Sequence, residues 1–166
     1  YTKPASNVVI QMCAIETARQ GINFPIATSN IHATFRKDLV DWGKICNEIL
    51  VWDYVIQFQN LVSPFPNFST MQDNINFYIA NNVSAVFCQG NREKGGEFAE
   101  LRGYLLAKLL WNPQCDMKQE MDDFLTGYYG KAGVYIKRYI ADMEQALKKS
   151  KAILSMDGDL EAHREG

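Results

Sequence analysis

Residues 49–54 read ILVWDY, an apolar run that ends in a carboxylic acid and a phenol. Two comparable runs, NVVIQMCAIETAR at residues 7–19 and VSAVFCQG at residues 83–90, also end in polar groups, and a helical pattern follows each of the three. Apolar runs of this length are typical of strands buried on both faces. Three strand–helix units predict an α/β fold with a parallel sheet, its strands adjacent and in chain order.

Polar or reactive side chains follow each predicted strand. The carboxyl ends of parallel strands lie at one edge of a sheet, where ligands bind in such folds, so we expect these groups to form one rim. Glu16, Asp53 and Gln89 should converge there, beside the loop that contains Pro64 and Pro66. The full set of rim candidates is Glu16, Thr17, Arg19, Asp53, Tyr54, Cys88, Gln89 and Gly90.

Composition excludes several classes of function. The chain has 166 residues, of which 47% are hydrophobic and 22% charged, and its formal net charge is -2. No basic stripe would attract nucleic acid, and no apolar run is long enough to span a membrane. The four cysteines and two histidines lack metal-site spacing, so we expect buried free thiols, no metal and no cofactor. The chain opens at Tyr1 without a signal peptide, and we expect it to begin inside a longer polypeptide.

Periodicity and punctuation locate the remaining elements. We predict strands near residues 7–15, 50–54 and 83–87, and a binding-type loop over residues 20–33. Helices are expected over residues 34–48, 69–80, 97–111, 116–127 and 132–155, with Thr34, a Ser69–Gln72 capping box and Asp116 as N-terminal signals. Residues 1–155 would form the folded part, and residues 156–166 a polar, frayed tail.

A solitary three-stranded parallel sheet would leave bare apolar edges. The pattern is better explained as a partial TIM (β/α)8 barrel, consisting of the last three β/α units plus two C-terminal helices.

Several long phrases carry a family resemblance. They are VWDYVIQFQNLVSPFPN, VFCQGN and, above all, GGEFAELRGYLLAKLLWNP followed by FLTGYYG. Over roughly residues 1–150 the chain resembles a bacterial glycoside-hydrolase family of endo-β-N-acetylglucosaminidases that was formerly a domain-of-unknown-function family. The resemblance implies the C-terminal part of a catalytic barrel, with the rest of the barrel and its acidic catalytic pair upstream of Tyr1.

The same resemblance implies an oligosaccharide or a glycoprotein glycan as the partner. It implies retaining hydrolysis with the substrate's 2-acetamido group as nucleophile, in a periplasmic, cell-surface or secreted protein. The family carries Glu where this chain has Cys88, which favours a rival function: a non-catalytic carbohydrate-binding protein on a degenerate barrel. An α-glucuronidase-type activity on the same barrel is a third alternative.

Asp53, Tyr54 and Glu16 are the candidate catalytic residues. A substrate-assisted mechanism needs a carboxylate to orient the acetamido group and a phenol to hold its oxygen, which suits Asp53 and Tyr54. The alternative for Asp53 is a loop cap. Glu16 is a second carboxylate for acid–base work, or forms an ion pair with Arg19. Strand alternation directs Trp52 and Tyr54 to one face and Asp53 to the other, unless the strand has already ended.

Arg19, Trp52, Gln89 and Glu97 are the candidate substrate-binding residues. Trp52 would stack on a sugar ring or pack in the core, and Gln89 would bind hydroxyl groups. Glu97 would contact a ligand at the rim, or favour the dipole of the helix that it opens. Cys88 has no neighbouring group that would activate it as a nucleophile.

Overall fold

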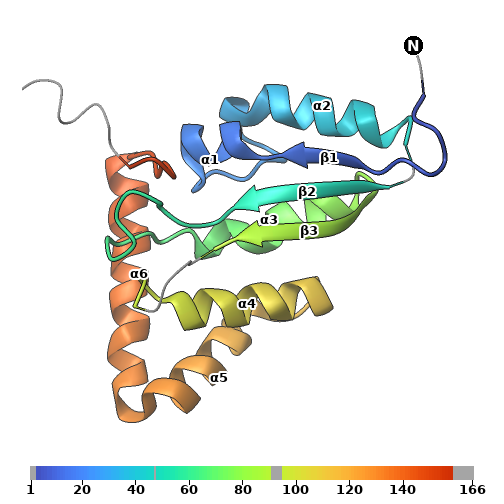
Figure 1. Ribbon diagram of the computed structural model, residues 1–166. Helices are drawn as coiled ribbons and strands as arrows, with labels where there is room; N and C mark the ends of the chain where they lie inside the picture. The colour runs from blue at the N-terminus through green and yellow to red at the C-terminus, as the bar shows by residue number, and fades with distance from the viewer. Residues whose placement is uncertain (1–2, 47, 91–94, 159–166) are drawn as a thin grey trace, which may run out of the picture.

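A computed structural model describes residues 3–46, 48–90 and 95–158. The chain alternates strands and helices before ending in a helical hairpin (Figure 1). In chain order the elements are β1 (Ile10–Cys13), α1 (Ile15–Gly21), η1 (Asn30–His32), α2 (Ala33–Gly43), β2 (Ile49–Tyr54), α3 (Phe68–Ile79), β3 (Val83–Gln89), α4 (Ala99–Trp111), α5 (Met117–Tyr129), η2 (Gly130–Ala132) and α6 (Gly133–Ser150).

The strands form one parallel sheet in the order β1–β2–β3. This confirms the predicted adjacency and direction. Cys13 pairs with Trp52, and Trp52 with Phe87, so these three residues lie in one row across the sheet. All three strands therefore end at the same edge of the sheet, on the left in Figure 1.

In the part of the chain that the structure describes, helices cover one face of the sheet and leave the other without a helix. In Figure 1, α3 lies behind the sheet, with α2 above and α4 below, and the face toward the viewer carries no helix. Side chains on the covered face, such as Ile49 and Val51 of β2, are fully buried. They pack with Tyr78 of α3 and Leu105 of α4 in one core. The opposite face, which we call the open face, leaves Phe87 50% exposed.

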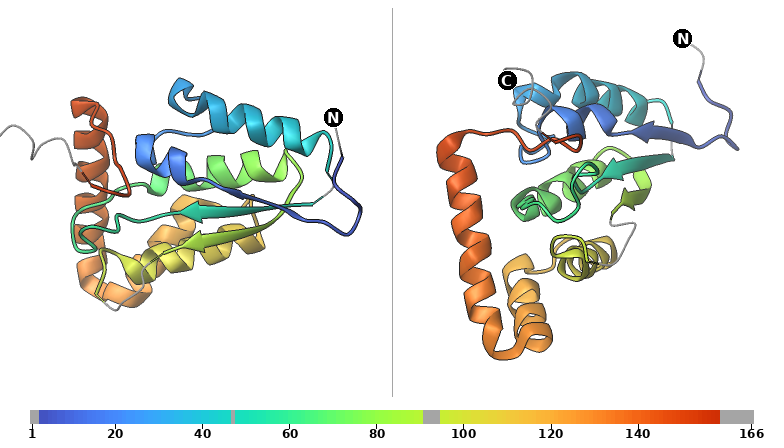
Figure 2. Two further views of the ribbon diagram at one scale, coloured as in Figure 1. Left: turned by 45° about the horizontal axis from the view of Figure 1, so that its top comes forward. Right: turned by 60° about the vertical axis from the view of Figure 1, so that its left-hand side comes forward.

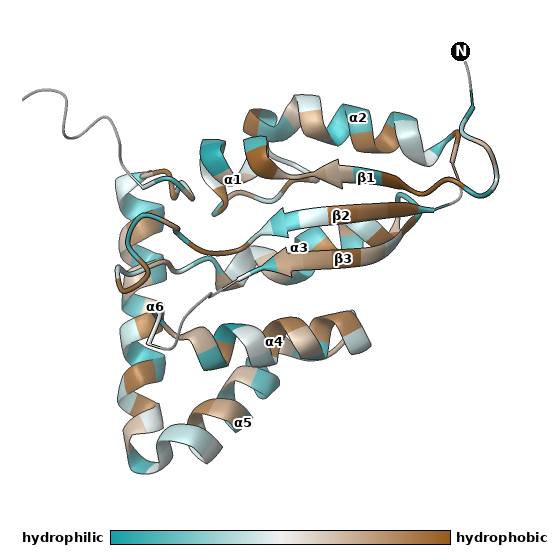
Figure 3. Cartoon of the chain, in the orientation of Figure 1, coloured by the Kyte–Doolittle hydropathy of each residue, from teal (hydrophilic) through white to brown (hydrophobic). Residues whose placement is uncertain are grey.

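Hydropathy follows this arrangement along β2. Figure 3 shows the ribbon of β2 changing from hydrophobic at its start to hydrophilic at its tip. The apolar start faces the core, while the tip carries the side chains that the sequence suggested for a site.

The first predicted strand is too long and the first loop starts too early. The ladder ends where the Ala14 N–H donates to the Trp52 carbonyl at 2.8 Å. Ala14 O then accepts from the Thr17 hydroxyl at 2.7 Å and from the Ala18 N–H at 3.1 Å, which starts α1. Glu16 and Arg19 consequently lie on a helix rather than at a strand end.

Two of the three predicted N-terminal signals are wrong. α2 begins at Ala33, so Thr34 is already helical. α3 begins at Phe68, and the Gln72 amide reaches out to the carbonyls of Pro113 and Cys115 instead of closing a capping box. The Asp116 cap is confirmed, because its Oδ1 accepts from the N–H groups of Lys118 and Gln119.

Helix ends also differ from the predicted ones. α2 stops at Gly43, α4 starts at Ala99, and α5 continues two residues past Gly127. α6 ends at Ser150 because Lys151 adopts a left-handed conformation with φ 56°. Among the described residues, no helix is long and apolar enough to cross a membrane.

α6 and the segment after it cross the edge where the strands end (Figures 1 and 2). Residues 152–158, which we call the strap, return from α6 to this edge. The N–H of Met156 donates to the Ala18 carbonyl and its carbonyl accepts from the Phe58 N–H, both at 2.8 Å. Met156 is buried, so the predicted frayed tail is wrong for residues 156–158, while residues 159–166 lie outside the described residues.

Candidate functional site

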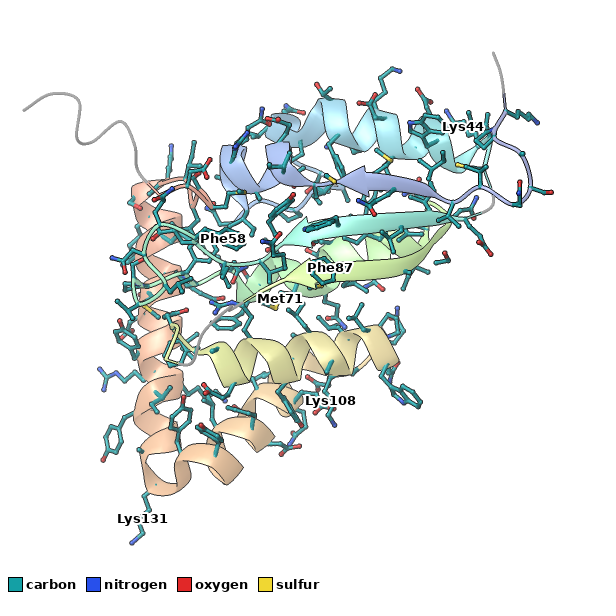
Figure 4. All side chains as sticks on the ribbon, in the orientation of Figure 1. Lys44, Phe58, Met71, Phe87, Lys108 and Lys131 are labelled. Atoms are coloured by element: carbon teal, nitrogen blue, oxygen red, sulfur yellow. The ribbon has the colours of Figure 1, made fainter. Side chains whose placement is uncertain are left out.

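Aromatic side chains gather on the open face at the end of β2. The Trp52 ring lies 6.4 Å from the Tyr54 ring in a stacked pair and 4.9 Å from the Phe87 ring, edge to face. Phe58, from the loop after β2, meets Tyr54 edge to face at 6.2 Å. Figure 4 labels Phe58 and Phe87, which mark the two ends of this surface. We call these four side chains the aromatic platform.

Hydrogen-bonding groups border the aromatic platform. The Trp52 indole N–H donates to Gln89 Oε1 at 2.8 Å, which leaves the Gln89 amide nitrogen as a donor on the same face. Cys13 lies beside Tyr54, and burial is the main reason that the pKa of Tyr54 is raised above its usual value. Its hydroxyl therefore stays protonated at neutral pH and can donate a hydrogen bond.

Asp53 points away from the aromatic platform. Since side chains alternate along a strand, its carboxylate faces the helix layer. There Oδ2 accepts from the buried Tyr78 hydroxyl at 3.1 Å, and Oδ1 accepts from the Tyr54 N–H at 2.8 Å. Burial raises the pKa of Asp53 to about 6, while these two hydrogen bonds act in the opposite direction.

The cavity that Asp53 lines has a volume of about 20 Å³. It lies beneath the sheet, together with His32, Asn67 and Thr70. Such a space is too small for a sugar ring. The prediction that Glu16, Asp53 and Gln89 share one site is therefore wrong for Asp53, and this placement gives no support for direct contact between Asp53 and a ligand on the open face.

Cys88 lies beside Asp53 on the covered face. The two residues are paired in the sheet register. Burial, followed by the nearby Asp53 charge, raises the pKa of the Cys88 thiol to about 12. This thiol is protonated at physiological pH, consistent with the inference that Cys88 is no nucleophile. All four cysteines are free.

Glu97 takes part in a buried ion pair. Its Oε2 lies 2.8 Å from Arg102 Nη2, and the side chains are 10% and 3% exposed. Arg102 also donates to the carbonyls of Glu97 and Phe65, so it fastens the proline-containing loop to the start of α4. Because Glu97 is nearly buried in this pair, the structure gives no support for the predicted ligand contact, while its place directly before the N-cap Phe98 agrees with the helix-dipole alternative.

Arg19 pairs with Asp157 rather than with Glu16. The Arg19 Nε lies 2.8 Å from Asp157 Oδ2, which ties α1 to the strap. Glu16 is exposed on α1. Asp157 and Phe58 are rim residues that the sequence did not single out. Asp157 lies 138 positions from Arg19, and no local pattern signals such a pair.

The chemistry of this rim is that of a polar-edged aromatic surface. The described residues contain no cluster of His, Cys, Asp or Glu that could hold a metal ion. Flat rings with neighbouring amide, phenol and guanidinium groups suit a ligand with an apolar face and many hydroxyl groups, and sugars have this character.

Comparison with known proteins gives one family. The model of the family described as "Domain of unknown function (DUF4838)" matches residues 1–141. No curated protein and no solved structure matches the chain. The matched region contains the whole sheet, the aromatic platform and α1–α5. The chain therefore belongs to the DUF4838 family.

Proposed function

We propose that this chain is part of a (β/α)8 barrel that acts on N-acetylglucosamine-containing glycans as an endo-β-N-acetylglucosaminidase-like glycoside hydrolase. The observation that supports this most is the aromatic platform at the carboxyl ends of the strands. Ligands bind at this end in barrels of this class. The single helix layer and the open face are what three adjacent units of a barrel wall would look like.

In this proposal the platform binds and orients the sugar. Trp52 stacks on the apolar face of a ring, and the Gln89 amide nitrogen donates to a hydroxyl group. The Tyr54 hydroxyl donates to the substrate's acetamido oxygen, which attacks the anomeric carbon as the glycosidic bond breaks; water later opens the cyclic intermediate with retention. The acid that protonates the leaving oxygen belongs to an earlier strand of the barrel, as the resemblance implies.

A non-catalytic carbohydrate-binding protein is the second candidate. It is favoured by the positions of two carboxylates that the sequence suggested as site residues, because both are bonded to other side chains of the protein. Asp53 is bonded to Tyr78 beneath the sheet, and Glu97 is paired with Arg102. In this reading the platform binds a glycan without cleaving it.

The test uses the full-length protein and an N-glycan substrate, with released glycan measured by mass spectrometry. Tyr54→Phe removes one hydroxyl, and we expect kcat to fall about 10²-fold, the usual loss for one transition-state donor. Trp52→Ala should weaken glycan binding. Tyr135→Phe on the exposed side of α6 is the matched control and should change neither quantity.

Three outcomes separate the candidates. Glycan release that depends on Tyr54 supports the hydrolase. Binding that depends on Trp52 without any release supports the carbohydrate-binding protein. Absence of both would contradict the glycan proposal.

A further inference from the structure

A second hollow lies beside α6. Its volume is about 440 Å³, within the range of small-molecule sites. It is bounded by the second half of α6, the start of the strap, the loop after α1 and the first turn of α3. The lining residues are Asn23, Phe24, Pro66, Ser69, Glu144, Leu147, Lys148, Lys151 and Ala152. We call this hollow the α6 groove.

The walls of the α6 groove are mainly apolar. Phe24 contributes a ring, and Pro66 and Leu147 contribute aliphatic surface on either side. Pro66 is buried, while Phe24 and Leu147 are half-buried, so part of their apolar surface stays in contact with solvent. Covering such surface with an apolar group is favourable.

Positive charge lies at the mouth of the α6 groove. Lys148 and Lys151 line it from α6 and its carboxyl-terminal cap. In the described part of the chain, neither ammonium forms an ion pair. Ser69 lies in the first turn of the 12-residue helix α3, whose N-terminal end adds partial positive charge.

Among the described residues that line the α6 groove, Glu144 is the one carboxylate. It is half-buried, and burial is the main cause of the raised pKa of Glu144. The charge of Lys148 and the backbone N–H of Ser69 act against this shift. Two lysines against one acid leave the described side chains at the mouth with a net positive charge.

We propose that the α6 groove binds a small amphipathic carboxylate. Its apolar body would lie between Phe24, Pro66 and Leu147, and its carboxylate would accept hydrogen bonds from Lys148 and Lys151. The largely apolar walls favour an aliphatic chain over a hydroxylated sugar acid, because buried hydroxyl groups would find few partners there. This inference does not depend on the proposed glycan site.

The test is calorimetric titration of the full-length protein with octanoate. We expect binding, and at least about tenfold weaker binding in the double variant Lys148→Gln/Lys151→Gln, because charge-assisted hydrogen bonds are lost. Lys131→Gln/Lys149→Gln changes the net charge equally with side chains that do not line the groove, and it should bind octanoate as the wild type does. Leu147→Trp should block binding by filling the groove.

Further ligands and one more variant test the two parts of the proposed ligand, its carboxylate and its apolar body. 1-Octanol shares the chain but lacks the charge and should bind at least about tenfold more weakly, while Glu144→Gln should bind octanoate more tightly. Circular dichroism melts of every variant confirm folding. Failure of octanoate to bind, equal loss in both double variants, or equal affinity for 1-octanol would overturn the proposal. Lysine-dependent binding of glucuronate but not of octanoate would overturn the assignment of an aliphatic body.

Discussion

Replacing Asp53 by Asn should stabilise the protein at neutral pH. Burial raises the pKa of Asp53 from 3.8 to about 6, so its charged form is disfavoured in the folded state. A shift of about two units corresponds to about 3 kcal/mol, since one unit is about 1.4 kcal/mol. Asn keeps both contacts, because its oxygen can accept from the Tyr54 N–H and its amide can donate to the Tyr78 oxygen.

The sign of the pH dependence follows from proton binding. Between about pH 4 and pH 6 the folded state holds a proton on Asp53 that the unfolded state has released. The contribution of this group to stability is therefore complete below about pH 4 and is lost as the pH rises through about 6. Asn has no such loss. We expect the two proteins to be equally stable at pH 4 and the variant to be more stable, by up to about 3 kcal/mol, at pH 7.5.

Urea unfolding at several pH values, followed by circular dichroism, measures this difference directly. Asp123→Asn, at an exposed carboxylate on α5, is the control. A difference between Asp53→Asn and wild type that does not change with pH, or a less stable variant at pH 7.5, would show that burial of Asp53 does not disfavour its charged form. The kcat of the Asp53→Asn variant is a second readout. If Asp53 contacted the substrate directly, kcat would fall about 10²-fold. Because Asp53 lies beneath the sheet, we expect kcat to change by no more than a few-fold.

Three other features of the fold give testable outcomes. Arg102→Ala should lower the free energy of unfolding, measured with urea, by about 3–5 kcal/mol because it leaves the buried Glu97 charge without a partner. A loss below about 1 kcal/mol would contradict that pairing. Gly133→Ala should lower the melting temperature, since a Cβ would lie 2.5 Å from the Leu125 carbonyl oxygen, whereas Gly127→Ala on open α5 should raise stability by about 0.5–1 kcal/mol; equal effects would be inconsistent with the packing. The Met156 N–H, bonded to Ala18 in the packed strap, should exchange slowly with deuterium, and rapid exchange would contradict this packing.

The sheet could be predicted from the sequence because the pattern that marks a buried strand is a run of consecutive residues. ILVWDY and its two counterparts carry enough consecutive apolar residues to predict buried parallel strands, and their order follows from the connecting helices. Alternation along residues 52–54 also predicted that Trp52 and Tyr54 face away from Asp53. The local features that were misread are the N-terminal signals at Thr34 and Ser69 and the end of β1, where the Thr17 hydroxyl and the Ala18 N–H begin a helix on Ala14.

The composition of the site could not be predicted in full, because its key contacts join distant residues. Asp53 meets Tyr78 25 positions away, and Arg19 meets Asp157 138 positions away. Glu97 was expected at the rim, and only the fold shows that Arg102 pairs with it and also binds the Phe65 carbonyl of the loop after β2. The polar composition of residues 155–158 hides the buried Met156 that fixes the strap.

The structure of the full-length protein with a bound chitobiose-core glycan tests the central claim most directly. We expect a barrel that continues the β1–β2–β3 sheet, with a sugar ring stacked within about 4 Å of the Trp52 ring. Its acetamido oxygen should accept a hydrogen bond from the Tyr54 hydroxyl. A glycan bound elsewhere, or an aromatic platform buried beneath other parts of the chain, would contradict it.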